Sequence, residues 1–187
     1  MKLESIKKIH EGKFLTYYVA RYITKEGHIK DYELISRDKN LTLEKFGNNL
    51  PAGVGMVTFS SDKKKILLQK EFRMATNNWV YNFPAGLIDQ GESVEEAAKR
   101  EVREETGCEI KEIEVVLPPS YASQGTSDEM MSIVICTVEG EIKDSIYEEE
   151  EIEAKWYTKQ EVDKLIKEGA FMSVRTQMFL YLWVKER

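Results

Sequence analysis

The feature that most constrains this chain is a helical segment that places carboxylates on its apolar side. Ser93 opens a capping-box pattern and Gly107 is well placed to end a helix, so we expect a helix between them. At roughly 100° per residue, Glu101 and Glu105 fall in the middle of the inward face and Glu104 falls at its edge. The other inward positions are apolar: Val94, Ala97, Ala98 and Val102.

Ionised carboxylates need a partner when they face a core, because an unpaired buried charge is costly and like charges one turn apart repel. Protonation, an arginine or a metal ion would each solve this problem. Acids spaced by three and four residues share one helix surface, so Glu101, Glu104 and Glu105 could converge on divalent cations. The plainer alternative is an exposed charged helix whose last turn has left the core, and the spacing alone leaves both open.

Composition narrows the kinds of metal and partner. With two histidines and two cysteines in 187 residues, a metal site must use oxygen ligands, which favours magnesium, manganese or calcium. The net charge of −6 argues against nucleic-acid binding, although it allows an anionic substrate held by a metal ion. We see no leader pattern, no membrane-spanning apolar run and no disulfide framework, so we expect a cytoplasmic protein without a membrane partner.

The strand and helix signals predict a mixed sheet with one helix in mid-chain and helices at the end, an α/β or α+β class. Residues 14–23 and 31–37 have the composition of strands and would form a hairpin, and the loop 38–53 is a candidate boundary. We expect an apolar stripe on the last helix to pack in the core or against a second subunit. That stripe consists of Val174, Met178, Leu182 and Trp183.

Residues 86–108 follow the pattern Gly-x5-Glu-x7-Arg-Glu-apolar-x-Glu-Glu-x-Gly-apolar, with Cys108 as a soft match at the last position. This spacing resembles the Nudix box. The segments LLQKEFR, NFPAGLIDQGE, SQGTSDE and EEEEIEAKWY look like the branch of that family that hydrolyses ADP-ribose and similar nucleoside diphosphate sugars. The resemblance covers nearly the whole chain.

The resemblance implies the Nudix α/β/α sandwich, with a mixed β-sheet and a small N-terminal antiparallel β extension. We expect residues 1–48 to form that extension and residues 49–187 to form the Nudix hydrolase domain. In this branch an N-terminal sheet commonly helps to form a homodimer. The hairpin near residues 14–37 would then be an interface.

The resemblance also implies attack of water on a pyrophosphate, assisted by two or three Mg²⁺ or Mn²⁺ ions. Glu101 and Glu105 would be direct ligands, and Glu104 would bind directly or through water. The main-chain carbonyl of Ala85 commonly joins them, just before Gly86, which suits a backbone that approaches the ions closely. The reaction that the resemblance implies is cleavage of ADP-ribose to AMP and ribose 5-phosphate.

Other residues receive roles from the same resemblance. Glu92 and Arg100 are expected to form a structural ion pair that holds the loop to the helix. Arg73 is a candidate for pairing with a substrate phosphate, and an ordinary surface arginine is the alternative. In the loop 123–129, Gly125 and Glu129 are expected at the substrate, and Glu129 could also bind or orient an ion.

The general base would come from the acidic run that begins at residue 148. We expect Glu148 to activate the water, with Glu150 as the second candidate. A run of charges is usually only solvated, so at least two of its four acids are expected to have no role. Glu148 and Glu150 are thus the least constrained of the proposed catalytic residues.

Two departures from the ADP-ribose pattern leave the substrate open. Gln124 stands where a proline is usual, and Asn82 stands where an acid is usual just before the PAG stretch. Trp79 could stack on a base, although a core tryptophan is the simpler interpretation. The alternatives are another nucleoside diphosphate derivative, such as GDP-mannose, a dinucleotide cofactor or a dinucleoside polyphosphate, or a non-catalytic nucleotide-sensing module.

Overall fold

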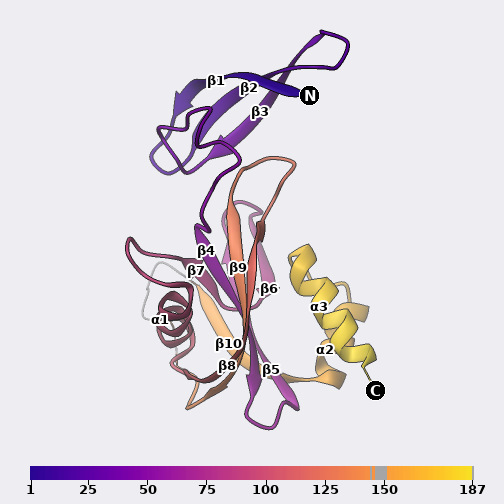
Figure 1. Cartoon of the computed structure of the whole chain (residues 1–187). Coiled ribbons are helices and arrows are strands. Elements are labelled where there is room, and N and C mark those ends of the chain that lie inside the picture. Colours follow the sequence, from indigo (N-terminus) through magenta and orange to yellow (C-terminus); the bar gives the residue numbers. More distant parts are fainter. Residues whose placement is uncertain (144, 146–150, 187) are drawn as a thin grey trace. The chain divides into compact units, whose positions relative to one another are not determined.

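The computed structural model describes residues 1–143, 145 and 151–186. Contacts within the chain divide it into two compact units, each described by itself (Figure 1). One unit comprises Met1–Ala52 with Pro119–Met131, and the other comprises Gly53–Pro118 with Ser132–Arg187. The division of function between residues 1–48 and 49–187 stays a prediction.

The N-terminal unit is built on a three-stranded antiparallel sheet of β1 (Lys2–Glu11), β2 (Thr16–Ile23) and β3 (Ile29–Ser36), in that spatial order. The predicted hairpin is present as β2 and β3, whereas the sequence did not predict β1. That strand is largely charged and mostly exposed, so its own composition gives little sign of a strand, and pairing with β2 defines it. A small core of Tyr18, Ala20, Leu34 and Leu41 lies beneath the sheet.

The second unit contains the remaining strands around one sheet with the order β10-β5-β4-β9-β8, while β6 pairs with β5 and β7 pairs with β4. The strands are β4 (Gly53–Ser60), β5 (Lys65–Arg73), β6 (Asn78–Asn82), β7 (Ala85–Leu87), β8 (Glu109–Tyr121), β9 (Met130–Glu139) and β10 (Ile152–Thr158). The helices are α1 (Val94–Thr106), α2 (Lys159–Lys167) and α3 (Val174–Lys185). This arrangement confirms the expected mixed α+β class.

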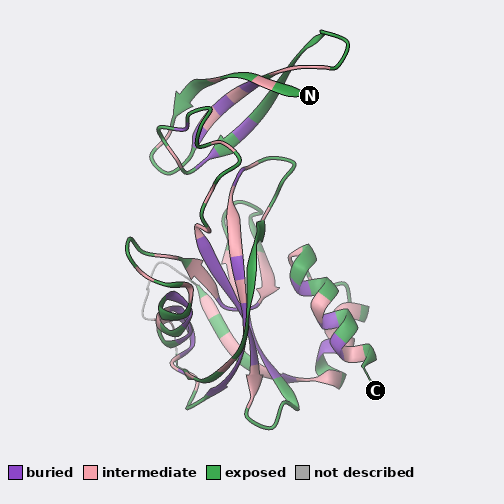
Figure 2. Cartoon of the chain, viewed as in Figure 1, coloured by how far each residue is buried: buried purple, intermediate pink, exposed green. Residues whose placement is uncertain are grey.

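Helices cover both faces of this sheet (Figure 1). Alternate residues of a strand point to opposite sides, so one strand contributes to the core on each face. On β5, Leu67 belongs to the core shared with α1, and its neighbours Ile66 and Leu68 belong to the core shared with α2 and α3. Figure 2 shows buried residues along the central strands and on the inner sides of the helices. Of the helices in the described part of the chain, none has the length and apolarity to cross a membrane.

The apolar stripe of the last helix does not pack as one side of a core. Trp183 is buried, together with Leu180, but Val174, Met178 and Leu182 are 80%, 60% and 60% exposed. Core packing was therefore the right interpretation for Trp183 and the wrong one for the other three. Their packing against a second subunit stays a prediction.

Candidate active site

Helix α1 is fixed at both ends by its own sequence. The Ser93 hydroxyl accepts a hydrogen bond from the Glu96 main-chain N–H, and the Glu96 carboxylate accepts one from the Ser93 N–H at 2.8 Å. At the other end Gly107 adopts a left-handed conformation with φ of 72°, which favours glycine. The capping box and the terminator that the sequence predicted are both confirmed.

The same helix turns two carboxylates inward, as the helical periodicity predicted. Glu101 and Glu105 are only 8% and 6% exposed. One oxygen of Glu105 accepts hydrogen bonds from the Gln69 side-chain amide at 2.9 Å and from the Ala85 N–H at 3.2 Å. Burial raises the pKa of Glu105 to about 8, against the opposing effect of the Gln69 hydrogen bond. Burial thus favours the neutral form of Glu105, whose side chain is held in place by β5 and β7.

Gly86 makes room for the second inward carboxylate. A Cβ atom at this position would lie 2.0 Å from the carboxyl carbon of Glu101, so any other residue would push this carboxylate away from the strand. Glycine therefore allows the close approach of the Glu101 carboxylate to β7, and its backbone conformation is not the reason. The Glu101 carboxylate lies directly against this strand.

Arg100 connects the loop before α1 to the acidic side chains of α1. Its guanidinium pairs with both oxygens of Glu92, at 3.0 and 2.9 Å, and this confirms the ion pair expected from the sequence. Its Nη1 atom also donates to Glu101 at 2.7 Å and to Glu104 at 3.1 Å. These carboxylates raise the pKa of Arg100 above its ordinary value, and Arg100 in turn lowers the pKa of Glu92.

The donor chemistry around α1 fits a hard divalent cation. Glu101, Glu104 and Glu105 offer carboxylate oxygens, and Gly86 leaves one of these groups in close contact with the backbone next to Ala85. Among the residues described here, no three Asp, Glu, His or Cys side chains are already arranged to hold a metal ion. Arg100 makes contacts with Glu101 and Glu104 that a cation would otherwise make.

Strand β5 adds two residues that sequence reasoning missed. Gln69 is 1% exposed and contacts Glu105, and Glu71, two residues further along the strand, contacts Arg73 at 3.1 Å. The alternation of Gln69, Glu71 and Arg73 along one face of a strand was the available signal. The side chain of Arg73 is 61% exposed, so it is accessible to a ligand. Trp79 is half-buried and packs edge-on against Phe72.

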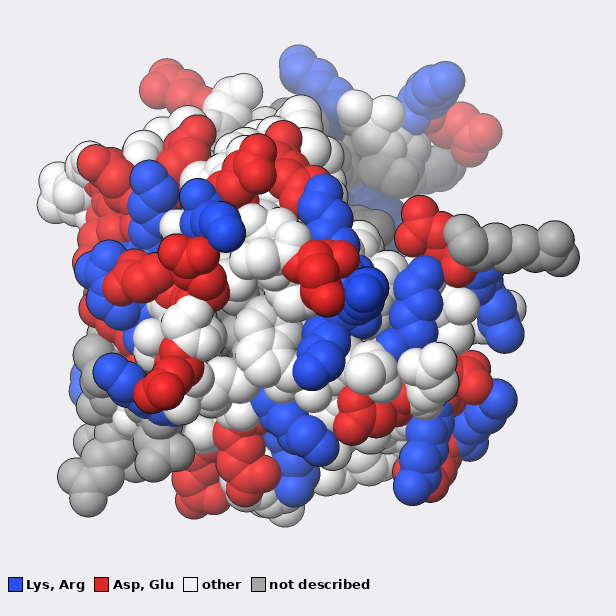
Figure 3. Space-filling view, turned by 90° about the horizontal axis from the view of Figure 1, so that it is seen from below, with Lys and Arg blue, Asp and Glu red and all other residues white. Residues whose placement is uncertain are grey.

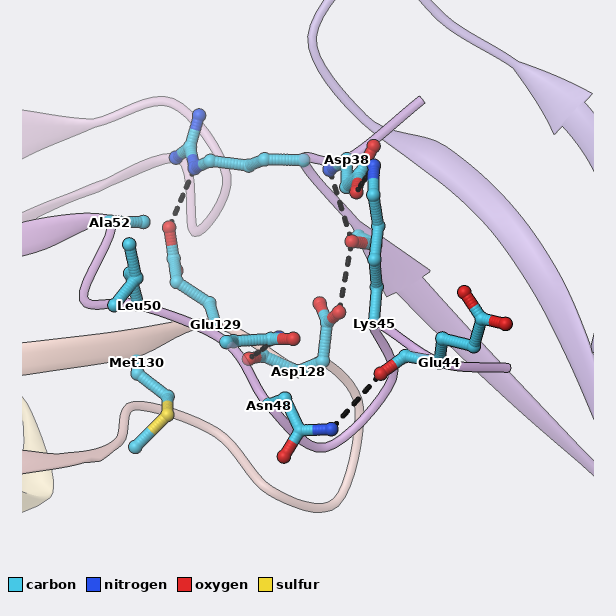
Figure 4. Close-up of a pocket in the computed structure, with 12 residues that line it drawn as sticks. Asp38, Glu44, Lys45, Asn48, Leu50, Ala52, Asp128, Glu129 and Met130 are labelled. Carbon is cyan, nitrogen blue, oxygen red and sulfur yellow. Dashed lines mark hydrogen bonds and ion pairs between the residues drawn. The ribbon is translucent and has the colours of Figure 1, made fainter. Parts of the chain in front are cut away.

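The loop 123–129 belongs to the N-terminal unit. The carboxylate of Glu129 accepts a hydrogen bond from Arg37 at 2.6 Å, and the carbonyl of Gly125 accepts one from the Tyr32 hydroxyl at 2.7 Å. Figure 4 shows Glu129 on the wall of a cavity of about 450 Å³ in that unit, near the buried Asp128. The expected contacts of Gly125 and Glu129 with substrate stay predictions.

The predicted general bases Glu148 and Glu150 lie outside the described residues, so their roles also stay predictions. The face drawn in Figure 3 carries basic and acidic side chains side by side. This mixture is unlike the continuous basic surface typical of nucleic-acid binding.

Comparison with known proteins places these features in context. Residues 49–176 match the model of the NUDIX domain family. An ADP-ribose pyrophosphatase of Bacillus subtilis is 26% identical over 183 residues, which span 96% of this chain and 91% of that protein. An ADP-sugar pyrophosphatase of Mus musculus is 28% identical over 133 residues, or 71% of this chain and 59% of the relative.

A solved structure of an ADP compounds hydrolase matches 99% of this chain and 95% of its own chain, with a TM-score of 0.75. Its sequence is 21% identical, so the likeness concerns the fold. The matched region includes both units, and the family match includes α1 with its caps and acids.

Proposed function

The chain belongs to the NUDIX family, and we propose that it cleaves the pyrophosphate bond of ADP-ribose to give AMP and ribose 5-phosphate. As a Nudix pyrophosphohydrolase it is related to ADP-ribose and ADP-sugar pyrophosphatases. The choice of ADP-ribose among nucleoside diphosphate sugars rests on the B. subtilis relative, whose match extends over almost the whole chain.

The observation that carries the proposal is the pair of inward carboxylates on α1. Glu101 and Glu105 are almost fully buried, yet their helix is otherwise an ordinary capped helix with an apolar face. Burying two carboxylates lowers stability, as the raised pKa of Glu105 indicates. A cost of this kind is typical of a site that must hold a cation.

Nudix hydrolases generally use divalent metal ions such as Mg²⁺. We assign two or three Mg²⁺ or Mn²⁺ ions to Glu101, Glu104, Glu105 and the main-chain carbonyl of Ala85. When bound, such ions neutralise the diphosphate and lower the pKa of the attacking water. Gln69 keeps one oxygen of Glu105 oriented, which fixes the direction of the carboxylate.

The remaining residues of this chain would bind substrate and move the proton. Arg73 would donate to a phosphate oxygen, since its guanidinium is exposed at the end of β5. Glu148, or Glu150 in its place, would take the proton of the attacking water. Gly125 and Glu129 would contact the substrate, and Glu129 could also bind or orient an ion.

The proposal includes a cytoplasmic homodimer. Large apolar side chains are exposed on the N-terminal unit, including Phe14 and Ile29, and on α3, including Val174 and Met178. Exposed apolar groups in such numbers favour burial against a second protein surface. Sedimentation equilibrium of the full chain should give the dimer mass, and a Phe14→Lys/Ile29→Lys variant should give the monomer mass.

The decisive experiment is hydrolysis of a nucleotide panel with Mg²⁺ or Mn²⁺, comparing wild type with Glu105→Gln. The panel contains ADP-ribose, GDP-mannose, UDP-glucose, NADH and diadenosine polyphosphates. Metal-dependent cleavage that favours ADP-ribose and is lost in the variant would support the proposal. Preference for another compound would reassign the substrate, and binding without turnover would identify a nucleotide-sensing module.

A further inference from the structure

Position 82 has an amide in place of the acid that the resemblance led us to expect, but a carboxylate is present next to it. Strands β5 and β6 pair antiparallel, with Gln69 opposite Asn82 and Glu71 opposite Val80. The Asn82 side-chain amide donates to Glu71 Oε1 at 2.7 Å. The acidic group is therefore supplied by the neighbouring strand.

The hydrogen bonds of Asn82 explain why an amide suits this position. Its oxygen accepts from the Ser173 N–H at 3.3 Å and from the Thr176 hydroxyl at 3.1 Å, both at the start of α3. These two donors fix the oxygen, so the amide nitrogen is directed at Glu71. A second carboxylate at position 82 would repel Glu71 at this distance. The two positions together therefore suit one acid and one amide.

Glu71 also lies on the face of β5 that meets the acids of α1. Residues 69, 71 and 73 share that face because side chains alternate along a strand. Gln69 contacts Glu105, and the negative charge of Glu71 contributes to the raised pKa of Glu105. The other Glu71 oxygen accepts from Arg73 Nη1 at 3.1 Å. Glu71 thus lies between the Asn82 amide and the exposed side chain of Arg73.

Burial differs sharply along this short series of contacts. The Glu71 side chain is 13% exposed, whereas the Arg73 side chain is 61% exposed. Glu71 can therefore restrain the arginine through a single contact and leave further N–H donors of the guanidinium directed to solvent. A restrained arginine loses less conformational freedom when it binds an anion, so it binds more tightly.

We propose that Glu71 is a positioning residue for the substrate diphosphate, held by Asn82 and acting through Arg73. It replaces, from the adjacent strand, the acid that this branch usually has at position 82. This inference rests on the proposed function, because it assumes that Arg73 meets a diphosphate. Glu71 and Asn82 act together in this inference, because Asn82 holds the carboxylate that positions Arg73.

The first test is a double-mutant cycle between Glu71 and Arg73. The full-length chain with Mg²⁺ is titrated with the non-hydrolysable analogue α,β-methylene ADP-ribose by calorimetry. Glu71→Gln should weaken binding about tenfold, and it should add less than about twofold in an Arg73→Ala background, because the two residues act as one unit. With ADP-ribose itself, Glu71→Gln should raise KM more than it lowers kcat.

The second test moves the charge across the strands. Asn82→Asp alone should lower the melting temperature and weaken analogue binding, since it places two carboxylates in contact. The Glu71→Gln/Asn82→Asp variant should recover the melting temperature, because one acid and one amide are restored. It should not recover the affinity, because residue 82 lies opposite Gln69 and Arg73 lies opposite Asn78. Glu153→Gln is the matched control, since Glu153 is an exposed acid that meets Lys70 of the same strand.

Three results would overturn the inference. One is a Glu71→Gln variant that folds normally and binds the analogue as tightly as wild type. Another is full additivity between Glu71→Gln and Arg73→Ala, and a third is a charge-exchanged variant that binds the analogue as tightly as wild type. If wild type cleaves ADP-ribose while any of these holds, only the role of Glu71 fails. A wild-type chain that neither cleaves nor binds would overturn the proposed function as well.

Discussion

Helices α1 and α3 depart from the usual pattern of helix burial in opposite ways. On α1, Glu101 and Glu105 are buried, whereas on α3 Val174 and Met178 are exposed. Both helices begin at a serine cap and both pack against the same sheet unit. A departure of either kind lowers stability or solubility, so each indicates a surface that something else must meet. We expect cations at α1 and an apolar protein surface at α3.

The largest expected effect comes from the substitution that removes a buried carboxylate from α1. Glu105→Gln keeps the shape of the side chain, and it should lower the rate of ADP-ribose hydrolysis by about three orders of magnitude because a metal ligand is lost. The metal-free variant should unfold at an equal or higher temperature than wild type, since a buried carboxylate is gone. Rate assays and thermal unfolding in EDTA measure the two effects.

A fall in both rate and stability would contradict this prediction. It would mean that Glu105 holds the fold together through Gln69 and Ala85, and that its burial is structural. The buried acids of α1 would then not indicate a surface for a ligand, and the contrast with the exposed apolar residues of α3 would no longer hold.

The pH dependence of the free energy of unfolding also tests the cost of burying Glu105. Burial raises the pKa of Glu105 to about 8 from an ordinary value of 4.5. Between these values the folded chain keeps a proton that the unfolded chain has released, so the free energy of unfolding should fall as pH rises and then level off above pH 8. The loss is at most about 5 kcal/mol. Urea unfolding without metal measures this loss as the difference in free energy of unfolding between wild type and Glu105→Gln at each pH.

Added Mg²⁺ should reduce this dependence, because a cation favours the ionised carboxylate. Parallel curves for wild type and Glu105→Gln across this pH range would show that Glu105 titrates normally. The inward acids would then need no cation.

Local signals account for what the sequence could predict about α1. Its caps and its carboxylate face follow from residues within one helix, so spacing alone located Glu101 and Glu105. Helix α3 is apolar on both sides, and the periodicity cannot say which side meets the sheet. It therefore did not separate the buried Trp183 from the exposed Val174, Met178 and Leu182. Gln69 and Glu71 were missed because their contacts join distant segments: Gln69 meets Glu105 of α1, and Glu71 meets Asn82 through the pairing of β5 with β6.

A neighbouring pair on α3 tests whether its apolar stripe is exposed in solution. Leu180 is fully buried and Leu182 is 60% exposed. Leu180→Ala should lower the free energy of unfolding by about 3 kcal/mol, and Leu182→Ala by less than about 0.5 kcal/mol. Urea unfolding at low protein concentration gives both values.

Equal costs for the two substitutions would contradict the exposure of the stripe in the isolated chain. A cost for Leu182→Ala that appears only at high protein concentration would instead indicate burial in a dimer. Such a result would strengthen the comparison with α1.

The smallest expected effects come from substitutions at the N-terminal caps of α1 and α3. Ser93 belongs to a reciprocal capping box with Glu96, whereas the Ser173 hydroxyl accepts from the Thr176 N–H in a helix that has no acidic residue in its first turn. Ser93→Ala should therefore cost about 1 kcal/mol and Ser173→Ala about half as much, as measured by urea unfolding. Equal costs would show that the carboxylate of Glu96 adds nothing to the cap. A larger cost for Ser173→Ala would show that the Ser173 hydroxyl acts mainly by donating to the Thr176 hydroxyl, which in turn donates to Asn82. The two helix starts would then differ by this link to β6 and not by their caps.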